Sequence, residues 1–120
     1  MRWRIESERG IRVLWRGPVK VDGQTWPATD GVSVLLSKGP HVLEPGDRDA
    51  PVRVLDFNGE LESAEVATGA VRLRYRSDSR AIALLDRIAS RVEVDGVPHQ
   101  GGGRSLLLPR GAHTVLLAVE

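Results

Sequence analysis

The chain contains two pairs of stretches that match in order and in spacing. Val19-Lys-Val-Asp-Gly23 matches Val92-Glu-Val-Asp-Gly96, and further on Leu35–Val42 matches Leu107–Thr114. The first pair is displaced by 73 positions (96 minus 23) and the second by 72 (111 minus 39), so a one-residue gap reconciles them. Internal similarity at a fixed displacement indicates that two segments fold alike. We therefore predict that one strand-and-turn unit occurs twice.

The length of the chain limits how the two units are arranged. It has 120 residues, of which 41% are hydrophobic, which is enough for one core and too few for two independent domains. We predict a single β-sandwich domain over residues 1–120, with repeat 1 at about 1–50, a bridging segment at about 51–69 and repeat 2 at about 70–120.

Each unit contains an alternating V-x-V strand that ends in Asp-Gly. This dipeptide favours a tight hairpin turn, because glycine adopts positive φ without strain. Asp22 and Asp95 are therefore predicted to be turn residues. A catalytic carboxylate is the alternative interpretation, but neither aspartate has an acid or base partner at a fixed spacing.

The second part of each unit is predicted to be strand, tight turn and strand, with the turns at Gly39 and Gly111. His41 and His113 follow two residues after these glycines, where a ring nitrogen can bond a turn carbonyl or, alternatively, a metal ion. We favour the structural role, because the histidines lie in different copies and no Asp, Glu or His stands beside either at chelating spacing. The sequence therefore predicts no metal site and no cofactor.

These motifs, V-x-V-D-G followed by an L-P-x-G-x-H-x-V strand pair, resemble PEGA-type and related immunoglobulin-like β repeats of bacterial surface and envelope proteins. The resemblance covers roughly residues 19–46 and 92–119. It implies an all-β fold, an immunoglobulin-like antiparallel β-sandwich, for which we expect about eight strands. It also implies a non-catalytic module or spacer that works beside other domains.

One stretch gives conflicting signals. Residues 79–90 contain good helix formers and apolar residues at Ile82, Leu85 and Ile88, which favours a helix. The aligned stretch of the first copy, Ile11–Trp15, is rich in β-branched residues, which favours a strand. Because copies of one unit should share a fold, we predict a strand at 80–86.

The bridging segment and the strand after it carry a strong charge pattern. Val52–Phe57 is a candidate strand, and Asn58–Glu65 is acidic and predicted to form turns. Arg72, Arg74 and Arg76 alternate with apolar residues, which places them on one face of a strand. We interpret this face as solvated and paired with nearby acids; an anion site is the alternative.

Three tryptophans and one histidine are the candidate ligand contacts, because flat aromatic rings stack on sugars and anchor protein partners. Trp3 and Trp15 are in register with the apolar residues of two strands, so both are predicted to lie in the core. Trp26 follows the first Asp-Gly turn and is either an exposed platform or a cap on the end of the sandwich. Its counterpart in the second copy is His99.

Composition and the lack of catalytic motifs narrow the function classes. The formal net charge of +1 gives no field that would hold a polyanion, so nucleic acid is not an expected partner. No apolar run has the length of a membrane span, and no nucleophile elbow or phosphate-binding loop is present, so we predict neither membrane insertion nor an enzyme. We expect an accessory module that docks on neighbouring domains or another protein, in an exported or surface protein as the resemblance implies. The alternative is a carbohydrate-binding module.

Overall fold

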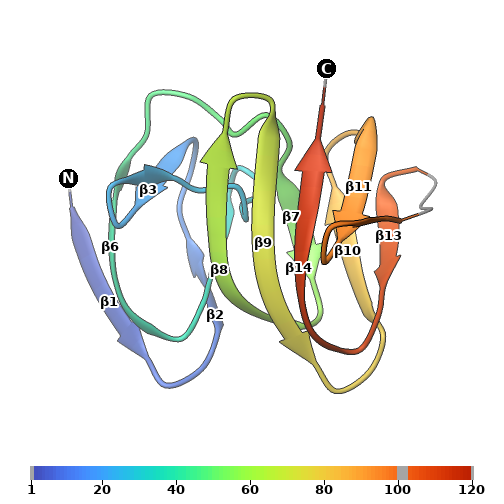
Figure 1. The fold of residues 1–120 in the computed structure, drawn as a ribbon. Helices are drawn as coiled ribbons and strands as arrows, with labels where there is room; N and C mark the ends of the chain where they lie inside the picture. The colour runs from blue at the N-terminus through green and yellow to red at the C-terminus, as the bar shows by residue number, and fades with distance from the viewer. Residues whose placement is uncertain (1, 100–102, 120) are drawn as a thin grey trace.

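The computed structural model describes residues 2–99 and 103–119, which form fourteen β-strands (Figure 1). In chain order these are β1 (Trp3–Ser7), β2 (Ile11–Leu14), β3 (Val19–Val21), β4 (Gln24–Thr25), β5 (Ser33–Leu36), β6 (Gly39–Pro45), β7 (Val54–Phe57), β8 (Glu60–Ala67), β9 (Ala70–Ser77), β10 (Ala81–Leu85), β11 (Arg91–Val94), β12 (Val97–Pro98), β13 (Ser105–Leu108) and β14 (Gly111–Ala118). The all-β prediction is confirmed, but the strand number expected from the sequence is too low. Short strands such as β4 and β12 follow tight turns directly and have no alternating pattern of their own.

The strands lie in two layers that pack face to face (Figure 1). The front layer contains a four-stranded sheet, β1-β6-β3-β4, and a five-stranded sheet, β12-β11-β14-β9-β8. The back layer contains β2-β5 and β13-β10-β7. The carbonyl of Pro27 accepts a hydrogen bond of 2.8 Å from the amide of Val54 on β7, so the back layer is tied together across the two halves of the chain.

The two halves of the chain pair their strands in the same way. The order β1-β6-β3-β4 corresponds to β9-β14-β11-β12, and β2-β5 corresponds to β10-β13. Arg4 pairs with Val42 and Arg74 pairs with Thr114, so Arg4 and Arg74 occupy equivalent positions. This register allows each position of the first half to be compared with its counterpart in the second.

The Asp-Gly pairs form the predicted hairpin turns. Asp22 and Gly23 have φ of 54° and 83°, and Asp95 and Gly96 have φ of 52° and 81°. Each pair joins two antiparallel strands by a two-residue loop, and positive φ at both central residues defines a type I′ turn. The turn predictions are therefore confirmed in both halves.

The turns at Gly39 and Gly111 are also present, with φ of 103° and 101°. They do not close hairpins, because β5 and β6 pair with different strands and lie in different layers, as do β13 and β14. Each of these turns therefore carries the chain from the back layer to the front layer.

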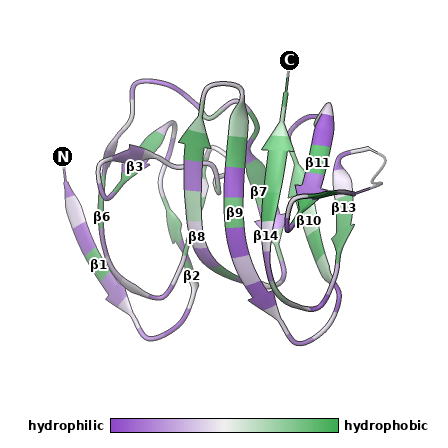
Figure 2. Cartoon of the chain, in the orientation of Figure 1, coloured by the Kyte–Doolittle hydropathy of each residue, from purple (hydrophilic) through white to green (hydrophobic). Residues whose placement is uncertain are grey.

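The stretch with conflicting signals is a strand, as predicted: β10 spans Ala81–Leu85. Ala81, Ala83 and Leu85 are buried, whereas Ile82 and Leu84 point out of the sandwich. Figure 2 shows that β10 is apolar along most of its length. Burial of one face of a strand between the layers outweighs the local helix propensity of this segment.

The prediction of turns over residues 58–65 was wrong for most of that stretch, because strand β8 begins at Glu60. Leu61 and Ala64 both point into the core although they are three positions apart. A bulge between Leu61 and Ser63 shifts the register and allows this. The bulge therefore removes the period-two pattern by which a strand is recognised.

Strands β7 and β8 form an arch that spans the two layers, which we call the β7–β8 arch (residues 54–67). In the back layer β7 pairs with β10, and in the front layer β8 pairs with β9. Between the layers the ring of Phe57 lies edge-on to Tyr75, with centroids 5.4 Å apart. A Cβ atom at Gly59 would lie 2.8 Å from the Phe57 ring, so any side chain at this turn would force the ring to move. The arch therefore closes one side of the second half.

We expect two neighbouring leucines on β13 to differ sharply in their effect on stability. Leu106 is 2% exposed and Leu107 is 47% exposed. Leu106→Ala should lower the free energy of unfolding by about 2–5 kcal/mol, because it leaves a cavity in the core. Leu107→Ala, the matched control, should change it by less than about 1 kcal/mol. Urea denaturation measures both free energies of unfolding. Equal losses in the two variants would contradict the assignment of Leu106 to the core and Leu107 to the surface.

Candidate functional site

The first Asp-Gly turn carries a side-chain network that the sequence did not predict. One carboxylate oxygen of Asp22 accepts a hydrogen bond of 2.9 Å from the amide of Val42, and the other lies 2.8 Å from Nδ1 of His41. Nε2 of His41 lies 2.9 Å from the carbonyl oxygen of Ser37 and 3.1 Å from its hydroxyl. The aspartate thus links its own hairpin to the turn before β6.

The same network recurs in the second half. The amide of Thr114 donates to Asp95, and Nδ1 of His113 lies 2.5 Å from the second Asp95 oxygen. Nε2 of His113 donates to the carbonyl of Arg110 at 2.7 Å. Both histidines therefore bond a turn carbonyl, which confirms their structural role. The aspartate partner of each ring lies on another strand, 18 or 19 positions away, so sequence spacing did not reveal it.

One sequence difference distinguishes the two networks. Ser37 places both its carbonyl oxygen and its hydroxyl within hydrogen-bond distance of Nε2 of His41. The counterpart of Ser37 is Pro109, which has no hydroxyl. His113 therefore faces two acceptors, a carboxylate and a carbonyl, and a ring with both nitrogens protonated satisfies them.

The ionisation of the second network follows from these contacts. The hydrogen bond to Asp95, with that to the Arg110 carbonyl, raises the pKa of His113 above its ordinary value of 6.5. The hydrogen bond from His113 in turn lowers the pKa of Asp95. Burial raises the pKa of the neighbouring Tyr75 to about 12, so its hydroxyl stays neutral and donates to the Pro109 carbonyl at 2.6 Å. Each of these groups is thus held by at least one hydrogen bond within its network.

Trp26 and His99 make equivalent structural contacts. Trp26 is 6% exposed, and its indole N–H donates to the carbonyl of Leu35 at 2.8 Å. Nε2 of His99 lies 2.9 Å from the carbonyl of Leu107, the counterpart of Leu35. Of the two interpretations of Trp26, the exposed platform is therefore excluded, and the ring covers the edge of β5.

Trp3 contradicts its prediction as a core residue. Its side chain is 45% exposed, whereas Trp15 is 9% exposed and lies in the core as predicted. The two rings meet edge to face, with centroids 5.5 Å apart at 84°, so they offer no coplanar platform. The predicted set of Trp26, His99, Trp3 and Trp15 is therefore not one site: Trp3 and Trp15 share a groove, and the other two residues lie elsewhere.

This groove is open and mainly apolar, with a volume of about 420 Å³. It is lined by Trp3, Leu14, Trp15, Arg16, Val32 and Pro45. Leu14 and Val32 are exposed like Trp3. The sequence did not identify these residues as a surface, because alternation indicates which face of a strand they share and not whether that face is covered.

A second apolar surface lies on the outer face of the back layer. Ile82 and Leu84 on β10 and Leu107 on β13 are exposed, and Ile82 pairs directly with Leu107. The sequence signal for this surface was the presence of large apolar residues on both faces of these strands, which is typical of strands that are covered on both sides.

A larger cleft of about 680 Å³, with a mixed polar and apolar lining, lies between β4 and the turn that joins β8 to β9. Its charged side chains, Arg48, Asp49 and Glu65, have both signs. Among the described residues no buried polar side-chain atom lacks a hydrogen-bond partner.

The arginine face of β9 matches its solvated interpretation. The register places Glu65 opposite Arg72 and Glu60 opposite Arg76, and Arg76 also lies 4.0 Å from Glu62. Over residues 2–99 and 103–119, no three His, Cys, Asp or Glu side chains gather as metal ligands. In the same part of the chain, no helix is long and apolar enough to cross a bilayer.

Comparison of the chain with protein-family models, with curated proteins and with solved structures found no match.

We expect Asp95 to control the titration of His113. Asp95→Asn removes the carboxylate, so the pKa of His113 should fall towards its ordinary value, as measured by NMR of the imidazole protons against pH. Asp22→Asn is the matched control and should leave the His113 titration unchanged. Because folding raises the pKa of His113, its contribution to stability is present below about pH 6.5 and is lost as pH rises through the folded pKa. An unshifted His113 in the Asp95→Asn variant would contradict the network.

Proposed function

We propose that the protein is a non-catalytic β-sandwich module that docks on a neighbouring domain or protein. The observation that carries this proposal is the exposure of large apolar side chains at two separate places. Trp3, Leu14 and Val32 surround the groove of the first half, and Ile82, Leu84 and Leu107 form the outer face of the second. Clustered apolar side chains on a small domain are typical of protein interaction sites.

The chemistry of the two surfaces favours protein partners. The groove combines an aromatic ring with aliphatic side chains and the guanidinium of Arg16 on its rim. Tryptophan and arginine are the residue types that most often dominate binding energy in protein interfaces. The histidines and aspartates that would serve catalysis in another protein are here engaged in turn networks.

The proposal also covers the kind of protein to which such a module belongs. Its repeated V-x-V-D-G turns and the layered strands that follow support a relationship to PEGA-type, immunoglobulin-like repeats. By that relationship, the module belongs to a larger bacterial protein that is exported or displayed at the surface, where it spaces or docks other domains.

Carbohydrate binding is the second candidate, and the exposed ring of Trp3 is the observation that favours it. Aromatic rings stack on the apolar faces of sugars. The edge-to-face packing of Trp3 on Trp15 weighs against a flat sugar platform. The candidate therefore depends on a single ring.

Position-dependent cross-linking tests the docking proposal. A photo-cross-linking amino acid is placed at Leu14, at Leu107 or at Arg72, and the protein is irradiated in the cells that produce it. Discrete adducts are expected at one or both leucine positions and not at Arg72, which lies on the charged face of β9. Absence of adducts at both leucines would contradict docking through these surfaces.

Tryptophan fluorescence separates the two candidates. The docking proposal predicts no saturable spectral change when soluble polysaccharides and oligosaccharides are titrated into the protein. A saturable change with one glycan class that disappears in Trp3→Ala would instead support the carbohydrate-binding function. Trp26→Ala is unsuitable as a probe, because the buried Trp26 side chain supports β5.

A further inference from the structure

The two halves differ in how completely their inward-facing side chains are buried at one side of the sandwich. In the second half, the inward side chains of β9 and β10 are all buried: Leu73, Tyr75, Ala81, Ala83 and Leu85. At the equivalent positions of the first half, Trp3 is exposed, Ile5, Ile11 and Val13 are only partly buried, and Trp15 alone is buried. The β7–β8 arch accounts for the difference, because it lies along β9 and β10 and no described segment pairs with the outer edges of β1 and β2. We call these two edges and the side chains between them the open side.

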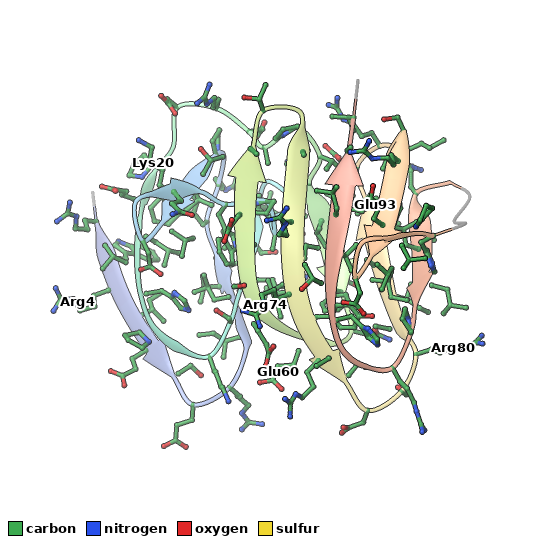
Figure 3. The ribbon with its side chains drawn as sticks, in the orientation of Figure 1. Arg4, Lys20, Glu60, Arg74, Arg80 and Glu93 are labelled. Atoms are coloured by element: carbon green, nitrogen blue, oxygen red, sulfur yellow. The ribbon has the colours of Figure 1, made fainter. Side chains whose placement is uncertain are left out.

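The backbone of β1 is also unpaired on this side. Val42 bonds Asp22 through both its amide and its carbonyl, so its polar groups face away from β1. In an antiparallel pair, two residues opposite one another either exchange backbone hydrogen bonds or both turn their backbone polar groups away from each other. Arg4 lies opposite Val42, so the amide and carbonyl of Arg4 point away from β6, towards the outer edge of β1. In Figure 3, Arg4 extends away from the molecule, whereas Arg74 lies in the middle of the front layer. An open strand edge of this kind is a template for another strand.

Charge distinguishes the open side from its closed counterpart. In the second half, Asp86 accepts hydrogen bonds of 2.8 Å and 3.2 Å from the amide and Nε of Arg53, where the chain enters the arch. The amides of Trp15 and Leu85 make equivalent bonds, to Val32 and Arg104, so the residue after each is equivalent too. The counterpart of Asp86 is therefore Arg16. A strand that enters the open side would therefore meet the positive charge of Arg16, whereas Arg53 meets the negative charge of Asp86.

We propose that the open side of the first half receives a strand pair of the β7–β8 kind, donated by a neighbouring β domain. One donated strand extends the front layer at β1, and the other extends the back layer at β2. The donated segment carries apolar residues that cover Trp3, Ile5 and Val13, and an acidic residue that faces Arg16. This inference rests on the proposed docking function, and it names the surface and the chemistry of the partner.

Two synthetic peptides test the inference with the whole protein. One has the sequence of residues 52–67, and the other has the same sequence with Arg53→Glu. Both are titrated into isotope-labelled protein, and chemical-shift changes are expected at the Trp3 indole and at the amides of Arg4 and Glu6. The acidic peptide should bind about fivefold more tightly, the upper range for one exposed ion pair. A scrambled peptide of the same composition is the control and should not bind.

Two protein variants make the test decisive. Arg16→Glu should reverse the peptide preference, because it recreates the charge of Asp86. Arg4→Pro should abolish binding without loss of fold, because the Arg4 amide points outward and proline is tolerated there. Val97→Lys, on the opposite side at β12, should leave binding unchanged. If Arg4→Pro does not fold, the charge reversal still tests the inference.

The peptide experiments overturn it if they show no saturable shifts with either peptide, unchanged preference in Arg16→Glu, or unchanged binding in a folded Arg4→Pro variant. Shifts at β1 that depend on protein concentration without peptide would also overturn it, since a second copy would then occupy the edge. If Leu14 forms cross-links but neither peptide binds, the strand-donation inference is rejected and the proposed docking function is retained.

Discussion

The β7–β8 arch is the part of the structure on which the rest depends. Its two strands extend different layers of the second half, and the Phe57 ring fills the space between them against Tyr75. The arch also reaches the first half through the hydrogen bond from Val54 to Pro27. One segment thus closes one half and joins it to the other. No described segment covers the first half in the same way, and there Trp3 is exposed and Ile5 is only partly buried.

The turn networks engage the aspartate and histidine side chains of both halves in structural contacts. In each half an aspartate with positive φ accepts a hydrogen bond from a backbone amide, that of Val42 on β6 or Thr114 on β14. The same aspartate also bonds a histidine ring, which in turn bonds a carbonyl in a second turn. These contacts satisfy the carboxylate and both ring nitrogens. Each network therefore fixes a two-residue hairpin to a turn that connects the two layers.

The sequence predicts this structure where local pattern and repetition agree. The turns at Asp22 and Asp95 follow from residue chemistry, and β10 could be assigned only by comparison with the first copy. Strand β8 was missed because its bulge interrupts the alternation of apolar and polar residues. The Asp–His networks were missed because the aspartate and the histidine lie 18 or 19 positions apart on different strands. The exposure of Trp3 could not be predicted, because its strand pattern matches that of β9 and only the presence of a covering segment differs.

Native-state hydrogen exchange at two arginine amides tests the account most directly. Arg4 and Arg74 occupy equivalent positions, and their amides face the outer edge of β1 and the partner strand β8, respectively. We predict that the Arg4 amide exchanges at the rate of an unprotected amide. The Arg74 amide should exchange slower by orders of magnitude, because its exchange requires β8 to separate from β9. Equal protection of the two amides would contradict it, because the first half would then have a covered edge.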